Sequence, residues 1–211
     1  LSIPVTVENP EACPRYSAVT ISGVKVTESP DWLKNALLTI GMRPINNIVD
    51  ATNYSMLLTA QPTHAYDYDK LRGHKLVSRM ACSGETIQLL NGKTYELNEN
   101  DIVIADGEGP VGLAGIMGGG ESEVSEETKN IVLEVANFDM YAVRRSAMRH
   151  GVFTDALTRF NKGQSPRQNP VVLAHLIGII TRLAGGEQAS NVFDEHAPDF
   201  DEASYQPVSF S

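Results

Sequence analysis

The sequence is short of positive charge. It has 17 lysine and arginine residues against 26 aspartate and glutamate residues, which gives a formal net charge of -9. A protein that grips a long nucleic-acid backbone needs clustered basic side chains, so the composition argues against that class while still allowing contact with a single-stranded end. The one basic cluster indicates either a solvated helix face or a local contact for an RNA end, and comprises Arg144, Arg145, Arg149, His150, Arg159 and Lys162.

Cysteines and long apolar runs are also scarce. Cys13 and Cys82 have no C-x-x-C spacing, and we expect both to be free thiols in a reducing compartment. No apolar run approaches the ~20 residues that a membrane-spanning helix needs, and no signal peptide is recognisable. These absences predict a cytoplasmic protein without membrane contact. Since the first residue is Leu1 rather than methionine, we expect a fragment of a longer chain.

Familiar catalytic and metal-binding motifs are missing as well. There is neither a G-x-S-x-G nucleophile elbow nor an H-E-x-x-H zinc motif. Asp67 and Asp69 lack the glycine and the distal glutamate of a calcium loop. The segment Gly92-Lys93-Thr94 ends like a phosphate loop, but Ile87 stands where the first glycine is needed. We therefore expect no metal site and no cofactor.

The apolar pattern predicts an α+β fold. A chain of 211 residues suffices for one large domain or two small ones in close contact. Apolar and β-branched runs predict strands at 5–7, 16–26, 76–80, 86–90, 94–97, 102–105, 111–117, 131–135 and 207–210. Start and stop signals predict helices at 48–58, 140–149, 154–161 and 171–183, and one more that begins at Pro30 with Ser29 as its cap and ends at Gly41. Because strands and helices are partly segregated, we expect a mostly antiparallel sheet.

Short polar side chains crowd the apolar run at 43–69. A helix that only fills a core does not need them, so they either satisfy buried backbone groups or line a pocket. They are Arg43, Asn46, Asn47, Asp50, Thr52, Asn53, Gln61, His64, Asp67 and Asp69. The glycine-rich segment 112–120 and the segment 149–163 have the same character. Such segments together in a small chain indicate a site.

Three positions near this run are candidates for chemistry. His64 follows the turn-like Gln61-Pro62-Thr63, and a loop histidine either orients a water or acts as a base, or caps a backbone carbonyl. Thr52 and Asn53 lie in the second half of the helix expected at 48–58. Their hydroxyl and amide groups either hold a water or bond to the nearby backbone.

Glu134 stands inside an apolar strand. Strict alternation puts it on one face with Val132 and Ala136, where an acid is costly unless it has a partner. It is either half of a buried ion pair with an arginine at 144–149, or a carboxylate that accepts a hydrogen bond from a ligand hydroxyl. The glycines at 112–120 either form an adjustable turn or bring backbone N–H donors close to a ligand.

A resemblance to a known family rests on seven motifs that occur in order. They are C-P-R-Y (13–16), S-P-D-W-L (29–33), R-P-I-N-N-I-V-D-A-T-N-Y (43–54), Q-P-T-H-A-Y-D (61–67), G-L-A-G-I-M-G-G (112–119), L-E-V-A-N-F (133–138) and H-G-V-F-T-D-A (150–156). This order resembles the B3/B4 module of bacterial phenylalanyl-tRNA synthetase beta subunits. The resemblance implies a single module over 1–211 with a barrel-like β core decorated by helices.

The resemblance also implies an activity: hydrolysis of tyrosine that has been mischarged onto phenylalanine tRNA. His64 matches the editing-site histidine, and Thr52 and Asn53 match residues that line the site. Glu134 matches the glutamate that reads the tyrosine phenol. Gly115 and Gly118 match a pocket wall, Thr154 and Ala156 match its floor, and Asp155 is placed to hold the substrate ammonium group.

The partners that the resemblance implies are the 3′ end of aminoacylated tRNA, the other beta-subunit domains and the alpha subunit. No aminoacylation is expected from this chain alone. Leu157, Thr158 and Asn161 depart from the family pattern, which concerns the helix surface rather than the pocket. The alternative function is a non-catalytic module that binds RNA or an aromatic ligand, or serves as scaffold. Convergence of His64, Asn53 and Glu134 in one cavity would separate the two.

Overall fold

The computed structural model describes residues 1–196, which form two large sheets and a small one. The first sheet is antiparallel except for the parallel pair β1–β4. Its strand order is β1 (Val5–Val7), β4 (Leu76–Met80), β7 (Ile102–Ala105), β8 (Pro110–Leu113) and β9 (Met117–Gly118). The small sheet is the hairpin of β5 (Thr86–Gln88) and β6 (Thr94–Glu96).

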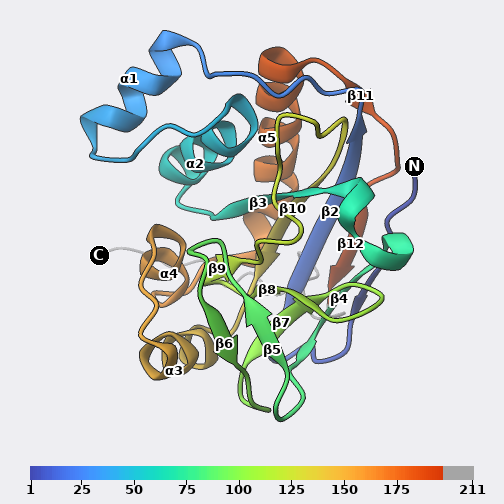
Figure 1. The fold of residues 1–211 in the computed structure, drawn as a ribbon, viewed down its shortest axis with the longest axis vertical. Helices are drawn as coiled ribbons and strands as arrows, with labels where there is room; N and C mark the ends of the chain where they lie inside the picture. The colour runs from blue at the N-terminus through green and yellow to red at the C-terminus, as the bar shows by residue number, and fades with distance from the viewer. Residues whose placement is uncertain (197–211) are drawn as a thin grey trace, which may run out of the picture.

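The second large sheet carries the longest strands and is antiparallel throughout. Its order is β11 (Glu187–Gln188), β2 (Arg15–Ser22), β10 (Asn130–Asn137) and β3 (Thr63–Asp67), and β12 (Phe193–His196) also pairs with β2. Strand β10 is central, because β2 and β3 flank it along most of its length. In Figure 1 it runs beside β2 through the middle of the molecule.

The helices form two groups (Figure 1). Helices α1 (Asp31–Thr39), α2 (Asn47–Thr59) and α5 (Asn169–Ala184) lie in the upper half of the view, and α3 (Met140–His150) and α4 (Asp155–Phe160) lie at its lower left. Short 3-10 helices occur at Tyr68–Lys70, Arg72–His74 and Pro166–Gln168. No helix of the described residues combines the length and the apolar character that a bilayer crossing needs.

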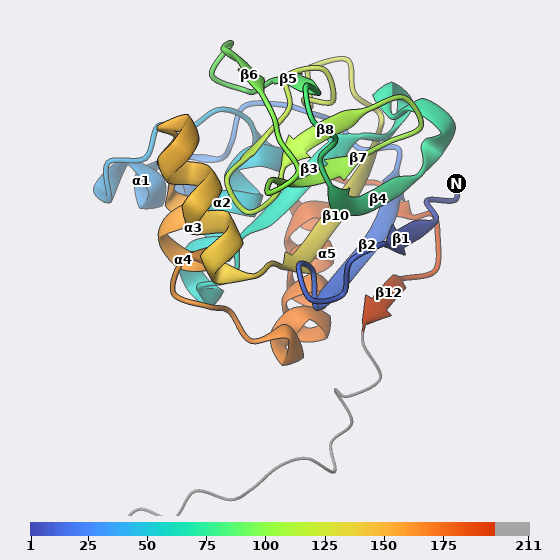
Figure 2. The ribbon, with the colours of Figure 1, turned by 90° about the horizontal axis from the view of Figure 1, so that it is seen from below.

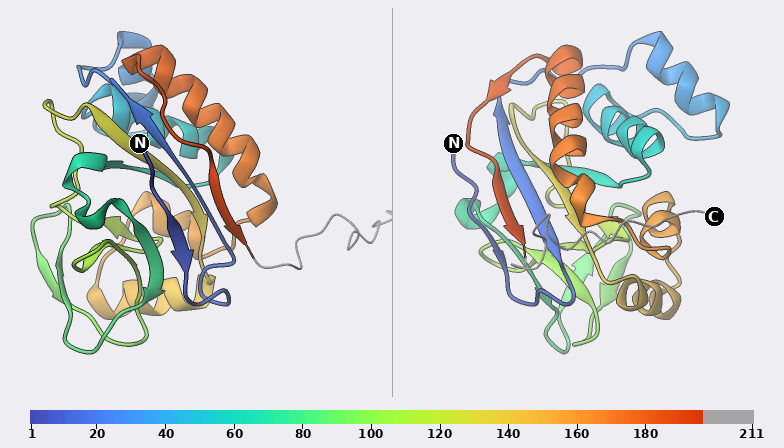
Figure 3. Two further views of the ribbon diagram at one scale, coloured as in Figure 1. Left: turned by 90° about the vertical axis from the view of Figure 1, so that its right-hand side faces the viewer. Right: turned by 180° about the vertical axis from the view of Figure 1, so that it is seen from behind.

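Strand β10 divides the core in two. Ile131, Leu133 and Val135 pack with buried residues of α2 and α5 on one face. Val132 and Ala136 belong to a second cluster that includes residues of β7 and β8. Figure 2 shows the resulting layers, with β7 and β8 on one side of β10 and α5 on the other, and the left view of Figure 3 shows α5 lying along this sheet. Glu134 shares the second face, as the alternation predicted.

The α+β class and the mostly antiparallel pairing are confirmed, although the sheets do not close into a barrel. Several strands match their predicted bounds, β1, β4 and β7 among them. The expected strand at 111–117 is interrupted, because Gly115 adopts a φ of 71° and turns the chain between β8 and β9. The strand expected at 16–26 ends at Ser22, and the one expected at 207–210 lies outside the described residues.

Two local predictions were wrong. His64 lies in strand β3 rather than in a loop, because the chain pairs with β10 directly after Gln61-Pro62. Ser29 does not cap α1; Pro30 occupies the cap position without a side-chain bond. The hydroxyl of Ser29 instead donates to Asp50 over 2.5 Å.

Candidate functional site

The polar residues at 43–69 divide into two groups, and the first satisfies buried backbone. Asn46 caps α2 by accepting from the N–H groups of Ile48 and Val49. The amide of Asn47 donates to the carbonyls of Lys25 and Leu183. Asp50 accepts from Ser29 and the Ile45 N–H, Gln61 donates to the Ala136 carbonyl, and Asp67 caps a 3-10 helix. These side chains hold the scaffold together, and none of them lines the cleft or the inner cavity described next.

The second group lines a cleft. Arg43, Thr52, Asn53 and His64 all border a hollow of about 410 Å³ between α2, the 116–118 segment and the start of α4. The hydroxyl of Thr52 donates to the Val49 carbonyl over 2.7 Å, so it is already used within its helix. No described residue bonds to the side chain of Asn53. Of the two neighbours, Asn53 is therefore the one available to a ligand.

A smaller cavity of about 90 Å³ opens from the same cleft. Both parts are bordered by Pro62, Thr63, His64, Ile116, Met117, Gly118 and Ala156. The inner cavity adds Tyr66, Glu134, Phe138 and Phe160, among others. It is smaller than the roughly 150 Å³ cavity that takes up benzene. An aromatic ring that enters it must therefore also occupy part of the outer cleft.

Glu134 and His64 meet in the inner cavity. They are cross-strand partners in the antiparallel pair of β10 and β3, so their side chains rise side by side from the same sheet face. The outer cleft includes His64 and Asn53 but not Glu134. The three candidates therefore converge on one continuous hollow, with His64 at the junction of its two parts.

The partners of Glu134 are two tyrosines, not an arginine. The hydroxyls of Tyr16 and Tyr66 both donate to Oε2 of Glu134, Tyr66 over 2.7 Å. Burial raises the pKa of the carboxyl, and the two hydroxyl donors oppose that rise. Of the two alternatives that the sequence left open for Glu134, the ion pair with an arginine at 144–149 is therefore wrong. No described residue donates to Oε1 of Glu134.

His64 is held by packing rather than by hydrogen bonds. Its ring contacts Tyr66 edge-on, with centroids 4.4 Å apart, and no described residue bonds to its nitrogens. Gly118 lies against it: a Cβ added there would be 2.6 Å from Cε1 of His64. Burial lowers the pKa of His64 to about 4. The imidazole is therefore neutral near pH 7, with one nitrogen that donates and one that accepts.

The glycines of the 112–120 segment permit close packing. A Cβ at Gly115 would meet Val143 of α3 at 3.0 Å and Phe160 of α4 at 3.2 Å. A Cβ at Gly119 would meet the Val111 carbonyl oxygen at 2.7 Å. The N–H groups of Gly119 and Gly120 already donate to Val111 and Gln88. Gly115 and Gly118 line the inner cavity.

Helix α4 closes the cavity from the other side. Thr154 caps it by accepting from the Leu157 N–H, and its hydroxyl donates to the Ile116 carbonyl over 2.8 Å. Thr154 thus ties α4 to the glycine segment. Ala156 borders both parts of the hollow. Asp155 is exposed at the rim of the outer cleft, and its Oδ1 lies 3.6 Å from Nη1 of Arg159.

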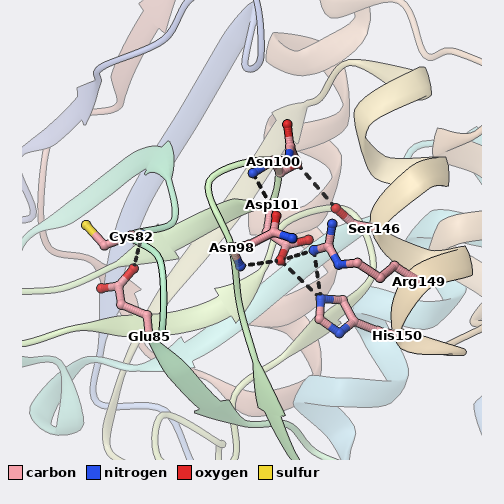
Figure 4. A network of polar contacts seen from close by, with 8 residues as sticks. All are labelled: Cys82, Glu85, Asn98, Asn100, Asp101, Ser146, Arg149 and His150. Atoms are coloured by element: carbon pink, nitrogen blue, oxygen red, sulfur yellow. Dashed lines mark hydrogen bonds and ion pairs between the residues drawn. The ribbon is translucent and has the colours of Figure 1, made fainter.

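The basic cluster is partly used in the scaffold. Figure 4 shows Arg149 and His150 of α3 directed at Asp101, which is fully buried, while Ser146 of the same helix contacts Asn100. Arg149 pairs with the Asp101 carboxylate, and His150 lies 3.1 Å from it. Arg144 and Arg145 are exposed on the same helix. The described residues contain no cluster of His, Cys, Asp and Glu that could hold a metal ion.

Sequence reasoning missed Tyr16 and Tyr66 as site residues. Each belongs to one of the seven motifs that carry the resemblance, but neither tyrosine was given a role there. A signal was present for Tyr66, because it shares a strand face with His64 two residues earlier. Tyr16 gave no local signal, since it reaches Glu134 only through the pairing of β2 with β10.

Comparison with known proteins shows a matching domain family and several similar proteins. The B3/4 domain family matches residues 12–185. The beta subunit of phenylalanine–tRNA ligase from Protochlamydia amoebophila is 46% identical over 199 residues, which cover 94% of this chain and 25% of that protein. The same subunit from Thermotoga maritima is 43% identical over 182 residues, which cover 86% of this chain and 23% of that protein.

A crystal structure of an N-terminal fragment of the phenylalanyl-tRNA synthetase beta subunit from Pyrococcus horikoshii is also similar. It aligns over 76% of this chain and 50% of that chain, with a TM-score of 0.49 and 15% sequence identity. The chain spans about a quarter of the length of the curated relatives that it matches.

Proposed function

We propose a hydrolytic function for the cavity, on the premise that this chain belongs to the B3/4 domain family. The resemblance first seen in the ordered motifs is thereby confirmed. Its relatives are beta subunits of phenylalanine–tRNA ligase. The proposed reaction is hydrolysis of the ester that joins tyrosine to phenylalanine tRNA, carried out as an editing step by the synthetase that contains this chain.

The observation that carries the proposal is the pairing of His64 with Glu134 at one cavity. Glu134 has an oxygen without a partner among the described residues, and that oxygen is suited to accept a phenol O–H. His64 lies at the mouth of the same cavity, where an ester bond would follow the aromatic ring outward. Recognition and hydrolysis thus use adjacent side chains.

This arrangement would distinguish tyrosine from phenylalanine in a way that an aminoacylation site for phenylalanine cannot. An apolar pocket that selects phenylalanine rejects an added hydroxyl weakly, by ~10². A site that hydrogen-bonds the hydroxyl can discriminate in the other direction by ~10⁴–10⁵, because phenylalanine leaves its buried polar groups unpaired. The buried carboxylate of Glu134 is such a group.

Hydrolysis of an activated ester needs an oriented water more than a covalent nucleophile. Burial lowers the pKa of His64 to about 4, which makes it a weak base and suits it to orient a water through its neutral ring. Asn53 offers a second polar group beside it. Because Gly119 and Gly120 use their N–H groups within the fold, oxyanion donors are to be sought at Gly115 and Gly118.

The outer cleft is the proposed place for the terminal nucleotide of the tRNA. Arg43 is the only lysine or arginine among the described residues that line it, and the structure gives it no acidic partner. Asp155 stands at the rim, where the resemblance places the substrate ammonium group. The remaining domains of the beta subunit and an alpha subunit are the proposed partners of this chain.

A second candidate function is a non-catalytic module that binds RNA or an aromatic ligand. It is favoured by the hydroxyl of Thr52, which is engaged within α2, and by the absence of a described residue that orients His64. In that case the cavity would bind an aromatic amino acid without cleaving its ester.

Deacylation of pre-formed tyrosyl-tRNA by the assembled synthetase separates the two functions. We expect the wild type to cleave the ester and His64→Ala to slow cleavage by ~10²-fold or more. His175→Ala is the matched control, because His175 is exposed on α5 and lies outside the cavity. A wild-type enzyme that binds the substrate without cleaving it would favour the binding module.

A further inference from the structure

Two buried tyrosines hold the carboxylate of Glu134 from either side. Tyr16 on β2 lies opposite Ala136, and Tyr66 on β3 lies opposite Val132, so each is offset by two positions from Glu134. The pleat places all three side chains on the same face of the sheet. Both hydroxyls donate to Oε2, so one hydrogen-bonded group spans three adjacent strands.

The two bonds fall on the same oxygen. Oε1 has no donor among the described residues, and Glu134 borders the inner cavity. Tyr66 also borders the cavity, whereas Tyr16 is fully buried and is not among its lining residues. An ionised carboxylate accepts at both oxygens. The protein thus fixes one oxygen and leaves the other for a ligand.

We propose that Tyr16 and Tyr66 are positioning residues that set the substrate preference, because they keep Glu134 ionised and aim its free oxygen at a ligand hydroxyl. The inference rests on the proposed function, since it concerns how the same cavity distinguishes a phenol from an unsubstituted ring.

The physical reason is the cost of an unpaired charge. Burial alone disfavours the charged form of Glu134, and the donors on Oε2 oppose that effect. A protonated Glu134 would tolerate phenylalanine better, because no buried charge would then lack a partner. The two hydroxyls therefore make the cavity selective by keeping the charge in place.

The titratable groups that face Glu134 come from the flanking strands and the residues before them. Burial raises the pKa of the Cys13 thiol to about 12 and lowers the pKa of His64 to about 4. It also raises the pKa of both Tyr16 and Tyr66 well above the usual value. The facing segment 112–118 contains no titratable side chain. Cys13, Tyr16 and Tyr66 therefore stay neutral as the solution is acidified from pH 7. His64 gains its charge near pH 4, so the loss of a donor to Glu134 is measured above that pH.

The test measures cleavage of tyrosyl-tRNA and phenylalanyl-tRNA by the assembled synthetase across pH. Tyr16→Phe and Tyr66→Phe each remove one hydroxyl and keep the ring. We expect the preference for the tyrosyl ester to narrow by roughly tenfold or more, the effect of one lost charge-assisted hydrogen bond. Loss of a donor also raises the pKa of Glu134 further. As the solution is acidified, each variant should therefore lose its preference for the tyrosyl ester at a higher pH than the wild type does.

The matched control is Tyr68→Phe. Tyr68 belongs to the same buried cluster, but its hydroxyl donates to the Ser2 carbonyl over 3.0 Å, so its loss should leave the preference unchanged. In a Glu134→Gln background, Tyr16→Phe should have no further effect on the preference, because the charge is already gone.

A folded Tyr16→Phe enzyme with the wild-type preference at every pH would overturn the inference. If circular dichroism shows that Tyr16→Phe does not fold, Tyr66→Phe decides in the same way. If the wild-type enzyme cleaves neither tyrosyl-tRNA nor phenylalanyl-tRNA, the proposed function itself is refuted, and this inference falls with it.

Discussion

Glu134 and His64 lie directly opposite each other on the antiparallel strands β10 and β3. One ladder of hydrogen bonds therefore fixes both the group that we propose for ligand recognition and the group that we propose for orienting a water. Both side chains line the inner cavity. Gly118 packs directly against the ring of His64, because it has no Cβ. Their roles are nevertheless separable by mutation, because no described contact links the carboxylate of Glu134 to the imidazole of His64.

Replacement of Glu134 by alanine should change selectivity more than general reactivity. The substitution removes a charge-assisted hydrogen bond to the phenol, worth ~1.5–3 kcal/mol. It also removes Oε1 of Glu134, the carboxylate oxygen that phenylalanine would leave without a donor. Cleavage of tyrosyl-tRNA should fall while the preference over phenylalanyl-tRNA narrows. His64→Ala should instead slow cleavage of both esters by a similar factor. An unchanged preference in Glu134→Ala would assign Glu134 a purely structural role.

Replacement of Ala156 by tryptophan should fill the cavity. Ala156 borders both the inner cavity and the outer cleft and is only partly buried, so the larger ring has an open side to enter. We expect deacylation to be blocked while circular dichroism and the unfolding temperature stay close to wild type. Thr158→Trp, at an exposed position on the same helix, is the control. A folded Ala156→Trp enzyme with normal deacylation would place the substrate elsewhere.

Replacement of Gly118 by alanine should displace His64. The new Cβ would lie 2.6 Å from Cε1 and 2.8 Å from Nε2 of the ring, which is closer than atoms pack. We expect cleavage to slow at least ~10-fold, because misplacement of a catalytic group by about 1 Å is costly. Gly109→Ala is the matched control, since a Cβ there meets nothing within 4 Å. Equal activity of the two variants would show that His64 can move without effect.

Replacement of Arg43 by glutamine tests where the tRNA phosphates lie. If Arg43 neutralises one phosphate of the terminal nucleotides, kcat/KM for tyrosyl-tRNA should fall and its salt dependence should become shallower by about one charge. Cleavage of tyrosyl-adenosine, which carries no phosphate, should be unaffected. Arg72→Gln is the control, because Arg72 is exposed and lies outside the cleft. A similar loss for both substrates would indicate that Arg43 acts on the fold instead.

Replacement of Asp101 by asparagine should weaken the fold in a pH-dependent way. Burial opposes ionisation of Asp101, but hydrogen bonds from Ser146, Asn98 and His150 outweigh it and lower its pKa. A lowered pKa in the folded state stabilises the protein above the unfolded value of ~3.9, and that contribution is lost as the pH falls through the folded pKa. We therefore expect Asp101→Asn to cost ~1–3 kcal/mol at pH 7, a difference that shrinks in acid.

Chemical denaturation at several pH values checks this expectation, with Asp155→Asn as the exposed control. A difference between Asp101→Asn and wild type that stays constant down to pH 3 would mean that the fold does not lower the pKa of the Asp101 carboxyl.

Local signals in the sequence predicted the elements well. The alternation around Glu134 placed it on the face with Val132 and Ala136, where the structure has it. A helix was expected from residue 48, and α2 begins at Asn47 with Asn46 as its cap. Such features depend on side chains and backbone groups within a few residues of each other, so they are visible without a fold.

Partners distant in sequence were not predictable in the same way. An arginine seemed the natural partner for the buried Glu134, yet Arg149 pairs with Asp101 and Glu134 receives two tyrosines. Only the register of β2, β10 and β3 decides which side chains meet. Ser29 shows the same limit: its sequence context suits a helix cap, but the buried Asp50 attracts its hydroxyl instead.

Strand β10 is enclosed on both edges by β2 and β3 and on both faces by the two core clusters. Amide hydrogens in such a position exchange with solvent only when the whole domain opens. The carboxylate that we propose as the selectivity element therefore sits on a strand that is paired on both edges and packed on both faces, whereas Arg43 and Asp155 stand on the exposed rim. The exposed side chains of the rim can change rotamer, whereas the carboxylate keeps its place in the buried sheet.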